Sequence, residues 1–591
     1  MKHPKLRALE TSRQMVDTFN GYNHNLRIGD GEFFDMKNMT SDHYPVLSPR
    51  TPRGVYGSPT SPNGLIAKDS LCYVDGSTFY INEYPVEMGL SNGPKQLISM
   101  GAYVIVMPDK MYINTKDTTD FGNIDAEVRT NADVTFTLCK LDGTDYSSDI
   151  PANPDEPEEP ANMAMWIDTS SVPHSLKQWS ESSGMWVTIP TTYVKISAAN
   201  IGTAFEKYDG ITITGLSGAL HDKVSGNVIE DTSDLAALEG AAVVWEKGDN
   251  YIVVVGMLDK TVTITDQVTI SRKMPDMDFL VESENRLWGC KYGIANDGSI
   301  VNELYACKLG DFKNWSCYMG LSTDSYTASV GTDGQFTGAI THLGYPLFFK
   351  ENCVHKVYGN YPANFQIQTT ACRGVQKGCE KSLAIVNETL FYKSRSAVCA
   401  YDGSLPAEVS YAMGNEAYSD AVGGSHGNKY YISMADSLGQ YHLFVYDIAK
   451  RMWHKEDDLK VDAFCSCRGE MYAISNGEIL TLYGSGTPDT APVEWMAETG
   501  EIGIFSPDMK YISRLTVRMS MGIGTEVRIY AKYDFDENWE LLCSLTGSSL
   551  RSFSLPIRPK RCDNMKLRFE GEGDVKIYSI TKTIEQGSEL S

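Results

Sequence analysis

The sequence predicts an all-β protein: a β-propeller with an inserted small β domain and a C-terminal β-sandwich. Three observations predict it. Short apolar strands separated by tight polar turns recur along the chain, and the last hundred residues read as alternating strands of five to eight residues. Helical periodicity is nearly absent, with one short stretch at 233–241 fitting a helix after a Thr/Ser cap. With 591 residues, 42% of them hydrophobic, the chain can form several packed β units.

The recurring unit is a hairpin, seen clearly at residues 470–484. Asn476-Gly477 separates two runs of alternating apolar side chains, which is a strong signal for a tight primed turn. Many units close with Tyr-Gly or Tyr-Asp-Gly. The units lie at 64–82, 97–114, 279–293, 303–315, 340–359, 383–403, 423–456 and 463–484. Antiparallel units repeated at roughly 40–50 residues per blade predict a propeller.

Two breaks interrupt this repeat. The acidic, Pro-rich run at 151–162 indicates an exposed linker, and it lies inside a segment whose sequence pattern differs from that of the repeated hairpins. The Gly/Pro-rich run at 485–493 precedes the strands of the predicted sandwich. The predicted parts are an extended N-terminal arm at 1–54, the first blades at 55–117, the inserted β domain or domains at 118–275, the remaining blades at 276–490 and the sandwich at 491–591.

The charge balance argues against a protein that grips nucleic acid by its phosphates. The net charge is −24, whereas phosphate binding needs clustered Lys and Arg. Within this acidic chain one local basic patch stands out, and it is equally compatible with a solvated strand face and with a docking surface for an acidic neighbour. The patch consists of Arg551, Arg558, Lys560, Arg561, Lys566 and Arg568.

Motif searches predict no catalytic residue, no cofactor and no metal ligand. Gly423–Gly427 fits G-x-S-x-G, but strand-like residues follow it where a nucleophile elbow needs a helix, so a hairpin turn is expected. The thirteen cysteines are expected to be reduced, buried thiols of a protein assembled in the cytoplasm. A metal site at Cys465 and Cys467 with Cys372 and Cys379 is the weaker alternative, because their spacing does not fit zinc. Neither a secretion leader nor a membrane segment is expected.

The most specific stretch is residues 19–54. Its Phe-Asn-Gly opening, its Asp-Gly-Glu turn and two Arg near Pro resemble the N-terminal segment of tailed-bacteriophage tail nozzle, tail tubular or DNA-stabilisation proteins. Residues 285–315, 383–403 and 574–590 resemble the same family. The chain departs from the family pattern at one point: it has Ser48-Pro49-Arg50-Thr51-Pro52-Arg53 where the family has an Arg-Pro dipeptide. This difference leaves open which position in the tail the protein would occupy.

The resemblance implies a structural virion protein of a phage tail, a nozzle or hub ring without enzymatic activity. It would be assembled in the host cytoplasm and would form part of the conduit for genome retention and ejection. Its implied partners are identical copies in a ring, commonly a hexamer, the portal and adaptor, other tail proteins, and duplex DNA that passes without specific binding. The inter-subunit contacts would fall on arm residues Phe19, Tyr44, Arg50 and Arg53.

Two other functions stay open. The first is a host-glycan-binding adsorption protein, in which Trp166, Trp179 and Trp186 of the insertion stack on sugars at the host surface. Partial burial of these tryptophans in a small β domain is the simpler reading. The second is an envelope or wall hydrolase whose carboxylates converge in a central channel, which the sequence cannot pair.

Overall fold

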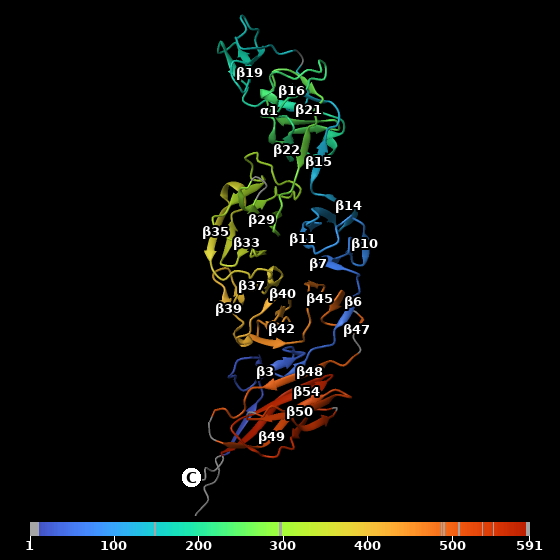
Figure 1. Ribbon diagram of the computed structural model, residues 1–591, viewed down its shortest axis with the longest axis vertical. Coiled ribbons are helices and arrows are strands. Elements are labelled where there is room, and N and C mark those ends of the chain that lie inside the picture. The colour runs from blue at the N-terminus through green and yellow to red at the C-terminus, as the bar shows by residue number, and fades with distance from the viewer. Residues whose placement is uncertain are drawn as a thin grey trace, which may run out of the picture.

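The chain forms an elongated β structure in three parts (Figure 1). The structure is a computed structural model and describes residues 11–146, 149–294, 298–485, 487–488, 491–505, 509–534, 536–547 and 549–586. The inserted segment forms one end, a propeller forms the middle and the C-terminal sandwich forms the other end (Figure 1). The first ten residues of the predicted arm lie outside the described residues.

Seven blades make up the propeller within the described part of the chain. Blade 1 is β7 (Pro62–Lys68), β8 (Ser70–Asp75), β9 (Thr78–Ile81) and β10 (Tyr84–Val86), and blade 2 is β11 (Gln96–Met100), β12 (Tyr103–Met107), β13 (Met111–Asn114) and β14 (Asp117–Asn123). Blade 3 is β28 (Phe279–Ser283), β29 (Arg286–Ile294), β30 (Ile300–Ala306) and β31 (Tyr326–Ser329). Blade 4 is β32 (Gly338–His342), β33 (Tyr345–Lys350), β34 (Cys353–Tyr358) and β35 (Gln366–Ala371).

Blade 5 is β36 (Ala384–Val386), β37 (Thr389–Lys393), β38 (Val398–Tyr401) and β39 (Ala407–Glu408), and blade 6 is β40 (Ser419–His426), β41 (Lys429–Ala435), β42 (Tyr441–Asp447) and β43 (Met452–Lys455). Blade 7 contains β44 (Ala463–Cys467), β45 (Glu470–Ser475) and β46 (Glu478–Thr481). The turn between β45 and β46 is the predicted hairpin, with both Asn476 and Gly477 at positive φ (51° and 82°), as a type I′ turn requires.

Strands from opposite ends of the propeller sequence close the ring. The N-terminal strand β6 (Gly54–Gly57) pairs with β46 and completes blade 7, and β47 (Thr487–Pro488) adds to its other edge. The innermost strand β44 contacts β7 of blade 1, so the last blade meets the first. The short 3-10 helix η3 (Glu380–Ser382) contacts the innermost strands of blades 4 and 6, β32 and β40, and the second strand of blade 5, β37.

The inserted segment contains a β-sandwich. Because β14 is the fourth strand of blade 2, the insertion begins after Asn123 rather than at residue 118. One sheet is β15 (Ala126–Arg129), β27 (Thr269–Arg272), β22 (Gly210–Thr214) and β23 (Gly240–Val243); the other is β24 (Glu246–Gly248), β25 (Tyr251–Val255), β21 (Tyr193–Ser197), β16 (Val134–Cys139) and β26 (Val262–Ile264). Fully buried aliphatic side chains and Phe136 and Phe205 fill the space between them.

A small four-stranded sheet extends this sandwich at the far end of the molecule (Figure 1). This tip sheet consists of β17 (Ala152–Asn153), β18 (Met165–Asp168), β19 (Ser175–Ser180) and β20 (Met185–Thr188). The helix expected at 233–241 is present as α1 (Ser233–Ala237), one turn long, and the remaining helices of the described residues are the 3-10 turns η1 (Ile201–Thr203), η2 (Pro362–Asn364), η3 and η4 (Tyr411–Met413). None of the described helices is long and apolar enough to span a membrane.

The C-terminal sandwich incorporates the N-terminal segment. One sheet is β1 (Thr11–Val16), β55 (Val575–Gln586), β49 (Lys510–Met521), β52 (Arg551–Ser554) and β53 (Arg561–Cys562). The facing strands are β2 (Gly21–Tyr22), β3 (Glu32–Lys37), β48 (Glu494–Thr499), β54 (Met565–Glu572), β50 (Glu526–Tyr533) and β51 (Glu540–Thr546), which continue the sheet of blade 6. The short pair β4 (Met39–Thr40) and β5 (Ser48–Pro49) precedes β6. The prediction of an extended arm is therefore wrong for the described residues, because the segment pairs within its own chain.

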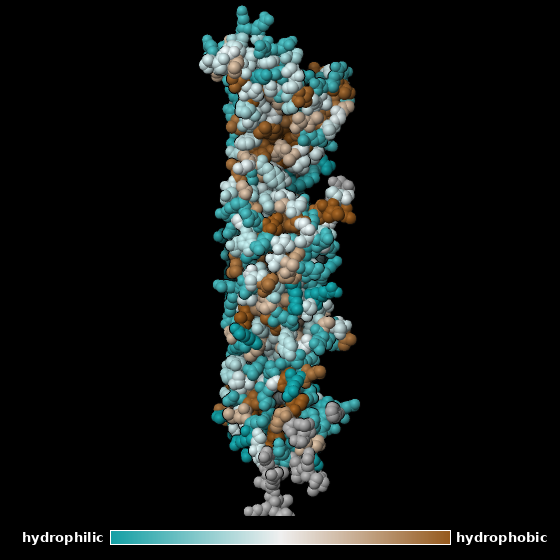
Figure 2. Space-filling view, turned by 90° about the vertical axis from the view of Figure 1, so that its left-hand side faces the viewer, coloured by the Kyte–Doolittle hydropathy of each residue, from teal (hydrophilic) through white to brown (hydrophobic). Residues whose placement is uncertain are grey.

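The predicted fold class is confirmed: the chain is all-β, with a propeller, an inserted β domain and a C-terminal sandwich. The thirteen cysteines are free, and all but Cys372, Cys465 and Cys543 are buried, as expected of thiols that act as small hydrophobes. Figure 2 shows one side of the molecule, where apolar side chains form scattered groups among hydrophilic ones and gather most over the inserted domain.

Candidate functional site

The three tryptophans of the insertion lie on one face of the tip sheet. Trp179 of β19 is directly opposite Trp186 of β20, and Trp166 of β18 is opposite Lys177, two residues before Trp179. Directly paired residues of antiparallel strands share a face, and so do residues two apart on one strand. The tip sheet is too small to enclose a conventional core, so its aromatic rings pack on each other along this face.

Trp166 is a packing residue. Its side chain is only 4% exposed, its indole N–H donates to the carbonyl of Asn153 at 3.0 Å, and its ring centroid lies 5.4 Å from that of Trp186. The ammonium of Lys177 covers the ring at 5.0 Å while pairing with Asp168 at 2.7 Å. A saccharide therefore cannot stack on Trp166, and the prediction that it contacts a glycan is wrong.

Trp179 lines an open cleft of about 780 Å³ at the end of the tip sheet. Its ring centroid lies 5.6 Å from that of Trp186 at 65°, so Trp186 supports it edge to face. Trp186 is half-buried and does not line the cleft. Around Trp179 the cleft offers amide, hydroxyl and carboxylate groups next to small apolar ones. The lining is completed by Asn162, Met163, Gln178, Ser180, Glu181, Ser182, Val187, Thr188, Ile189 and Pro190.

A second cavity of about 590 Å³ lies at the centre of the propeller. It is lined by residues in or just before the innermost strands, together with η3 and Ile474 of β45, so every blade contributes to it. Its charged residues are Lys95, Asp278, Glu380, Lys381 and Asp462, accompanied by Asn63, Gln96, Phe279 and Phe464. Carboxylate residues from three places in the sequence, Asp278, Glu380 and Asp462, thus border one central cavity.

The charged groups of this central cavity differ in how they are held. Asp278 accepts from Lys291 Nζ and from the backbone N–H of Tyr292, both at 2.8 Å, and Lys95 pairs with Asp109 at 2.7 Å. The carboxylates of Glu380 and Asp462, in contrast, form no ion pair or hydrogen bond within the described part of the chain. Two carboxylates without an intramolecular partner therefore border one cavity.

The G-x-S-x-G sequence is a hairpin, as expected. Gly423 to His426 end strand β40, and His426 pairs with Lys429 at the start of β41. Ser425 lies within the strand opposite Tyr430, where a nucleophile elbow would need a helix to follow.

The basic patch is divided by the fold. Lys560 pairs with Glu540 at 2.5 Å, and Lys566 and Arg568 both approach Glu498, at 3.8 and 3.1 Å. Three members are exposed and form no ion pair among the described residues, namely Arg551, Arg558 and Arg561. The charge available for docking is thus about half of what the sequence suggests, and docking itself stays a prediction.

The arm residues are engaged within their own chain. Phe19 is 2% exposed and its ring centroid lies 5.8 Å from that of Phe33. Arg50 and Arg53 form ion pairs with residues that follow blade 6, and Tyr44 is the most exposed of the four at 40%. The interactions that hold Phe19, Arg50 and Arg53 in this chain are intramolecular. The inter-subunit role of the four residues stays a prediction.

Comparison with known proteins gives matches only among solved structures; no family model and no curated protein matches. An exo-β-1,3-galactanase from Phanerochaete chrysosporium is 8% identical with a TM-score of 0.23, and the match covers 51% of this chain and 94% of the galactanase. A family 43 arabinoxylan arabinofuranohydrolase from Bacillus subtilis is 8% identical with a TM-score of 0.18, and the match covers 51% of this chain and 94% of that enzyme. The sialidase of Trypanosoma rangeli is 9% identical with a TM-score of 0.16, and the match covers 97% of this chain and 96% of the sialidase.

These comparisons correct the predicted function. The matches described are glycoside hydrolases and none is a phage tail protein, so the prediction of a non-enzymatic tail structural protein is contradicted and is not pursued. At such identities and TM-scores the matches carry no argument about reaction or substrate. The resemblance to tail nozzle proteins, the ring, the portal, adaptor and DNA partners and the virion location stay predictions.

Proposed function

We propose that the protein is a carbohydrate-binding protein and that the Trp179 cleft holds the saccharide. The observation that carries this proposal is the composition of the cleft: one partly exposed indole beside amide, hydroxyl and carboxylate side chains in about 780 Å³. This volume suits a ligand of oligosaccharide size, since ligand sites typically occupy about 300–1,000 Å³.

The chemistry of a sugar ring matches this lining. A pyranose presents a face of C–H bonds, which packs on an aromatic plane, and a rim of hydroxyls, which need hydrogen-bond partners when they leave water. Trp179 supplies the plane, and Asn162, Gln178, Ser180 and Glu181 supply donors and acceptors around it. The edge-to-face contact with Trp186 fixes the Trp179 ring before a ligand arrives, which lowers the entropy lost on binding.

The test is a glycan array followed by calorimetry with the best oligosaccharide. We expect wild-type protein to bind, Trp179→Ala to lose at least about tenfold in affinity, equal to about 1.4 kcal/mol, and Gln178→Ala to weaken binding less. Tyr411→Ala is the matched control, since Tyr411 is an exposed aromatic residue far from the tip. Retention of no glycan by wild-type protein, or equal affinity of Trp179→Ala, would refute the proposal.

A second candidate function is hydrolysis of a polysaccharide in the central cavity. The observation that favours it is that Glu380 and Asp462 both line this cavity with no intramolecular partner among the described residues. Glycoside hydrolysis needs two carboxyl groups, one as acid and one as base or nucleophile. Release of reducing ends should then be abolished in Glu380→Gln and in Asp462→Asn and unchanged in Trp179→Ala. Absence of turnover on any plant or bacterial wall polysaccharide would reject hydrolysis and leave the binding proposal standing.

A further inference from the structure

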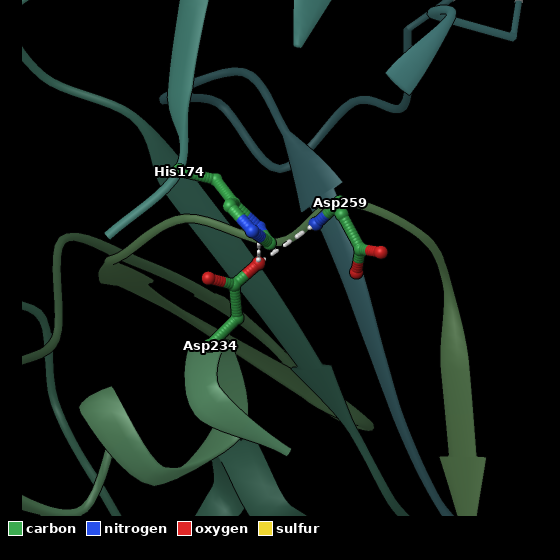
Figure 3. A group of neighbouring side chains, drawn as sticks. All are labelled: His174, Asp234 and Asp259. Atoms are coloured by element: carbon green, nitrogen blue, oxygen red, sulfur yellow. Dashed lines mark hydrogen bonds and ion pairs between the residues drawn. The ribbon is translucent and has the colours of Figure 1, made fainter. Parts of the chain in front are cut away.

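Three side chains from separate segments meet where the tip sheet joins the inserted sandwich (Figure 3). His174 precedes β19 of the tip sheet, Asp234 lies on α1, and Asp259 follows β25. His174 Nδ1 lies 2.9 Å from Asp234 Oδ2, which also accepts the backbone N–H of Asp259 at 3.0 Å. The three side chains each offer one metal-ligating atom, and these atoms all lie within 4.8 Å of one another.

The three residues form a buried, anionic junction. The side chains of His174 and Asp234 are each 7% exposed, and that of Asp259 is 30% exposed, which leaves a route from solvent. Besides His174, one cation pairs with the junction among the described residues: Lys260, whose Nζ lies 3.9 Å from Asp259 Oδ2. Two carboxylates therefore share a desolvated site with little positive charge, which is unfavourable unless a cation joins them.

We propose that His174, Asp234 and Asp259 bind one divalent transition-metal ion of the Zn²⁺ type. One imidazole nitrogen with two carboxylate oxygens is a donor set that suits zinc, whereas calcium and magnesium are held by oxygen ligands alone. Ligands at about 2.1 Å from a tetrahedral ion are about 3.4 Å apart. Ligating atoms that lie up to 4.8 Å apart would close in by at most about 1.4 Å, and the 2.9 Å contact between His174 and Asp234 would open by about 0.5 Å. The partly exposed side of Asp259 leaves the fourth position to water.

Such an ion would clamp the tip sheet to the sandwich. The tip sheet is joined to the rest of the insertion through few elements, and the His174–Asp234 contact crosses that joint. Binding to the folded arrangement alone stabilises it in proportion to the logarithm of metal concentration. The inference goes beyond saccharide binding and does not depend on it, because the metal is tested without any sugar.

A simple His–Asp hydrogen bond is the competing explanation, and two other pairs in the chain provide a contrast. His221 Nδ1 lies 3.0 Å from Asp266 in an exposed pair. His442 contacts Asp458 through Nδ1 and Asp436 through Nε2, so its two carboxylates lie on opposite sides of the ring. Only the group around His174 was found to bring three ligating atoms together within the described residues.

The experiment is equilibrium dialysis of the chelator-treated full chain against ZnCl₂, with metal analysis and thermal denaturation. We expect one zinc per chain in wild-type protein and in the control His221→Ala, and loss of that zinc in His174→Ala and Asp259→Asn. Added zinc should raise the unfolding temperature of wild-type protein and of His221→Ala, but not that of His174→Ala or Asp259→Asn. If His174→Ala does not fold, Asp259→Asn, at the most exposed position, decides.

A cobalt substitution separates this junction from the thiols. Co²⁺ bound to the nitrogen and oxygen ligands should give weak visible bands without the intense near-ultraviolet band of cobalt–thiolate bonds, and His174→Ala should remove them. Zinc bound equally by wild-type protein and both variants, no zinc bound at all, or a thiolate spectrum would each overturn the proposal.

Discussion

Arg53 binds Asp457 through both ends of its guanidinium: Nη1 donates to Oδ2 at 2.5 Å and Nη2 donates to Oδ1 at 3.1 Å. Nη2 also donates to Glu456 at 2.8 Å, and Arg50 approaches the same two acids. Arg53 directly precedes β6, whereas Asp457 follows blade 6. This ion-pair cluster, Arg50, Arg53, Glu456 and Asp457, therefore holds the strand that completes blade 7.

Replacing Arg53 should open this cluster at a large cost. The side chains of Arg53 and Asp457 are 11% and 19% exposed, so Arg53→Ala leaves two poorly hydrated carboxylates without their strongest partner. We expect a loss of about 3–5 kcal/mol in unfolding free energy, measured by denaturant titration. Arg53→Lys, which cannot bind in bidentate fashion, should lose less. The matched control is Arg373→Ala, whose pair with Glu408 is exposed. Equal stability of Arg53→Ala and this control would show that the cluster does not hold β6.

Two tryptophans of the tip sheet should separate stability from binding. Trp166→Ala removes a buried ring and should destabilise the inserted domain by about 3–5 kcal/mol, seen as faster limited proteolysis of residues 124–275. Trp179→Ala should change proteolysis little, because its ring is partly exposed. Rapid proteolysis of both variants would mean that Trp179 also serves the fold, and its loss of saccharide binding would then not identify a site.

Two buried histidines should make the protein sensitive to mild acid. Burial lowers the pKa of His355 to about 4 and that of His454 to about 3 from an ordinary value of 6.5, with the positive charges of Lys350 and Lys429, respectively, acting the same way. The unfolded chain takes up these protons below pH 6.5 while the folded chain does not. The stability that these neutral histidines contribute is thus complete above pH 6.5 and is lost as pH falls towards 4 for His355 and towards 3 for His454, by about 3 and about 5 kcal/mol, respectively.

The variant His454→Met tests how much of this pH dependence comes from protonation of His454. Neither ring nitrogen of His454 has a hydrogen-bond partner among the described residues, so the replacement removes the titration without breaking a bond. The slope of unfolding free energy against pH between 6.5 and 4.5 should become shallower, with stability at pH 7.5 nearly unchanged. An unaltered slope would show that His454 does not supply the proton uptake.

Gly374 is expected to tolerate no side chain. A Cβ at this position would lie 1.7 Å from the carbonyl oxygen of Lys350 and 3.2 Å from that of Cys353, both of them backbone atoms that cannot move aside cheaply. Gly374→Ala should therefore lower the unfolding temperature markedly or prevent folding. Gly331→Ala, where a Cβ meets nothing within 4 Å, should be within about 0.5 kcal/mol of wild type. Similar unfolding temperatures for the two variants would contradict the close approach at Gly374.

Local features of the fold are predictable from the sequence, and long-range ones are not. Asn476-Gly477 specifies its turn because the positive φ angles are a property of those two residues. Nothing around Val55 indicates that it pairs with Leu480, since such pairing depends on where seven blades bring the chain. For the same reason the predicted arm is in fact part of the sandwich.

The candidate sites likewise combine features that are local in the sequence with contacts that only the fold creates. The tryptophans of the insertion stand out in the sequence, but which of them is buried depends on the contact of Trp166 with Asn153 and Lys177. Glu380 and Asp462 carry no local signal, because each is a single acid, one at the start of the 3-10 helix η3 and the other directly before strand β44. His174 and Asp259 become neighbours of Asp234 only through the joint between two sheets, and no spacing rule connects them.

The closure of blade 7 by β6 has a consequence for the order in which the molecule is made. During synthesis β6 leaves the ribosome long before β46 has been translated. The backbone groups of β6 that pair with β46 therefore stay unpaired while all seven blades are made. Pairing of such distant segments raises contact order and slows folding, since the loop entropy is lost before the contacts form. We expect the newly made N-terminal strand to be the element that is most exposed to wrong partners.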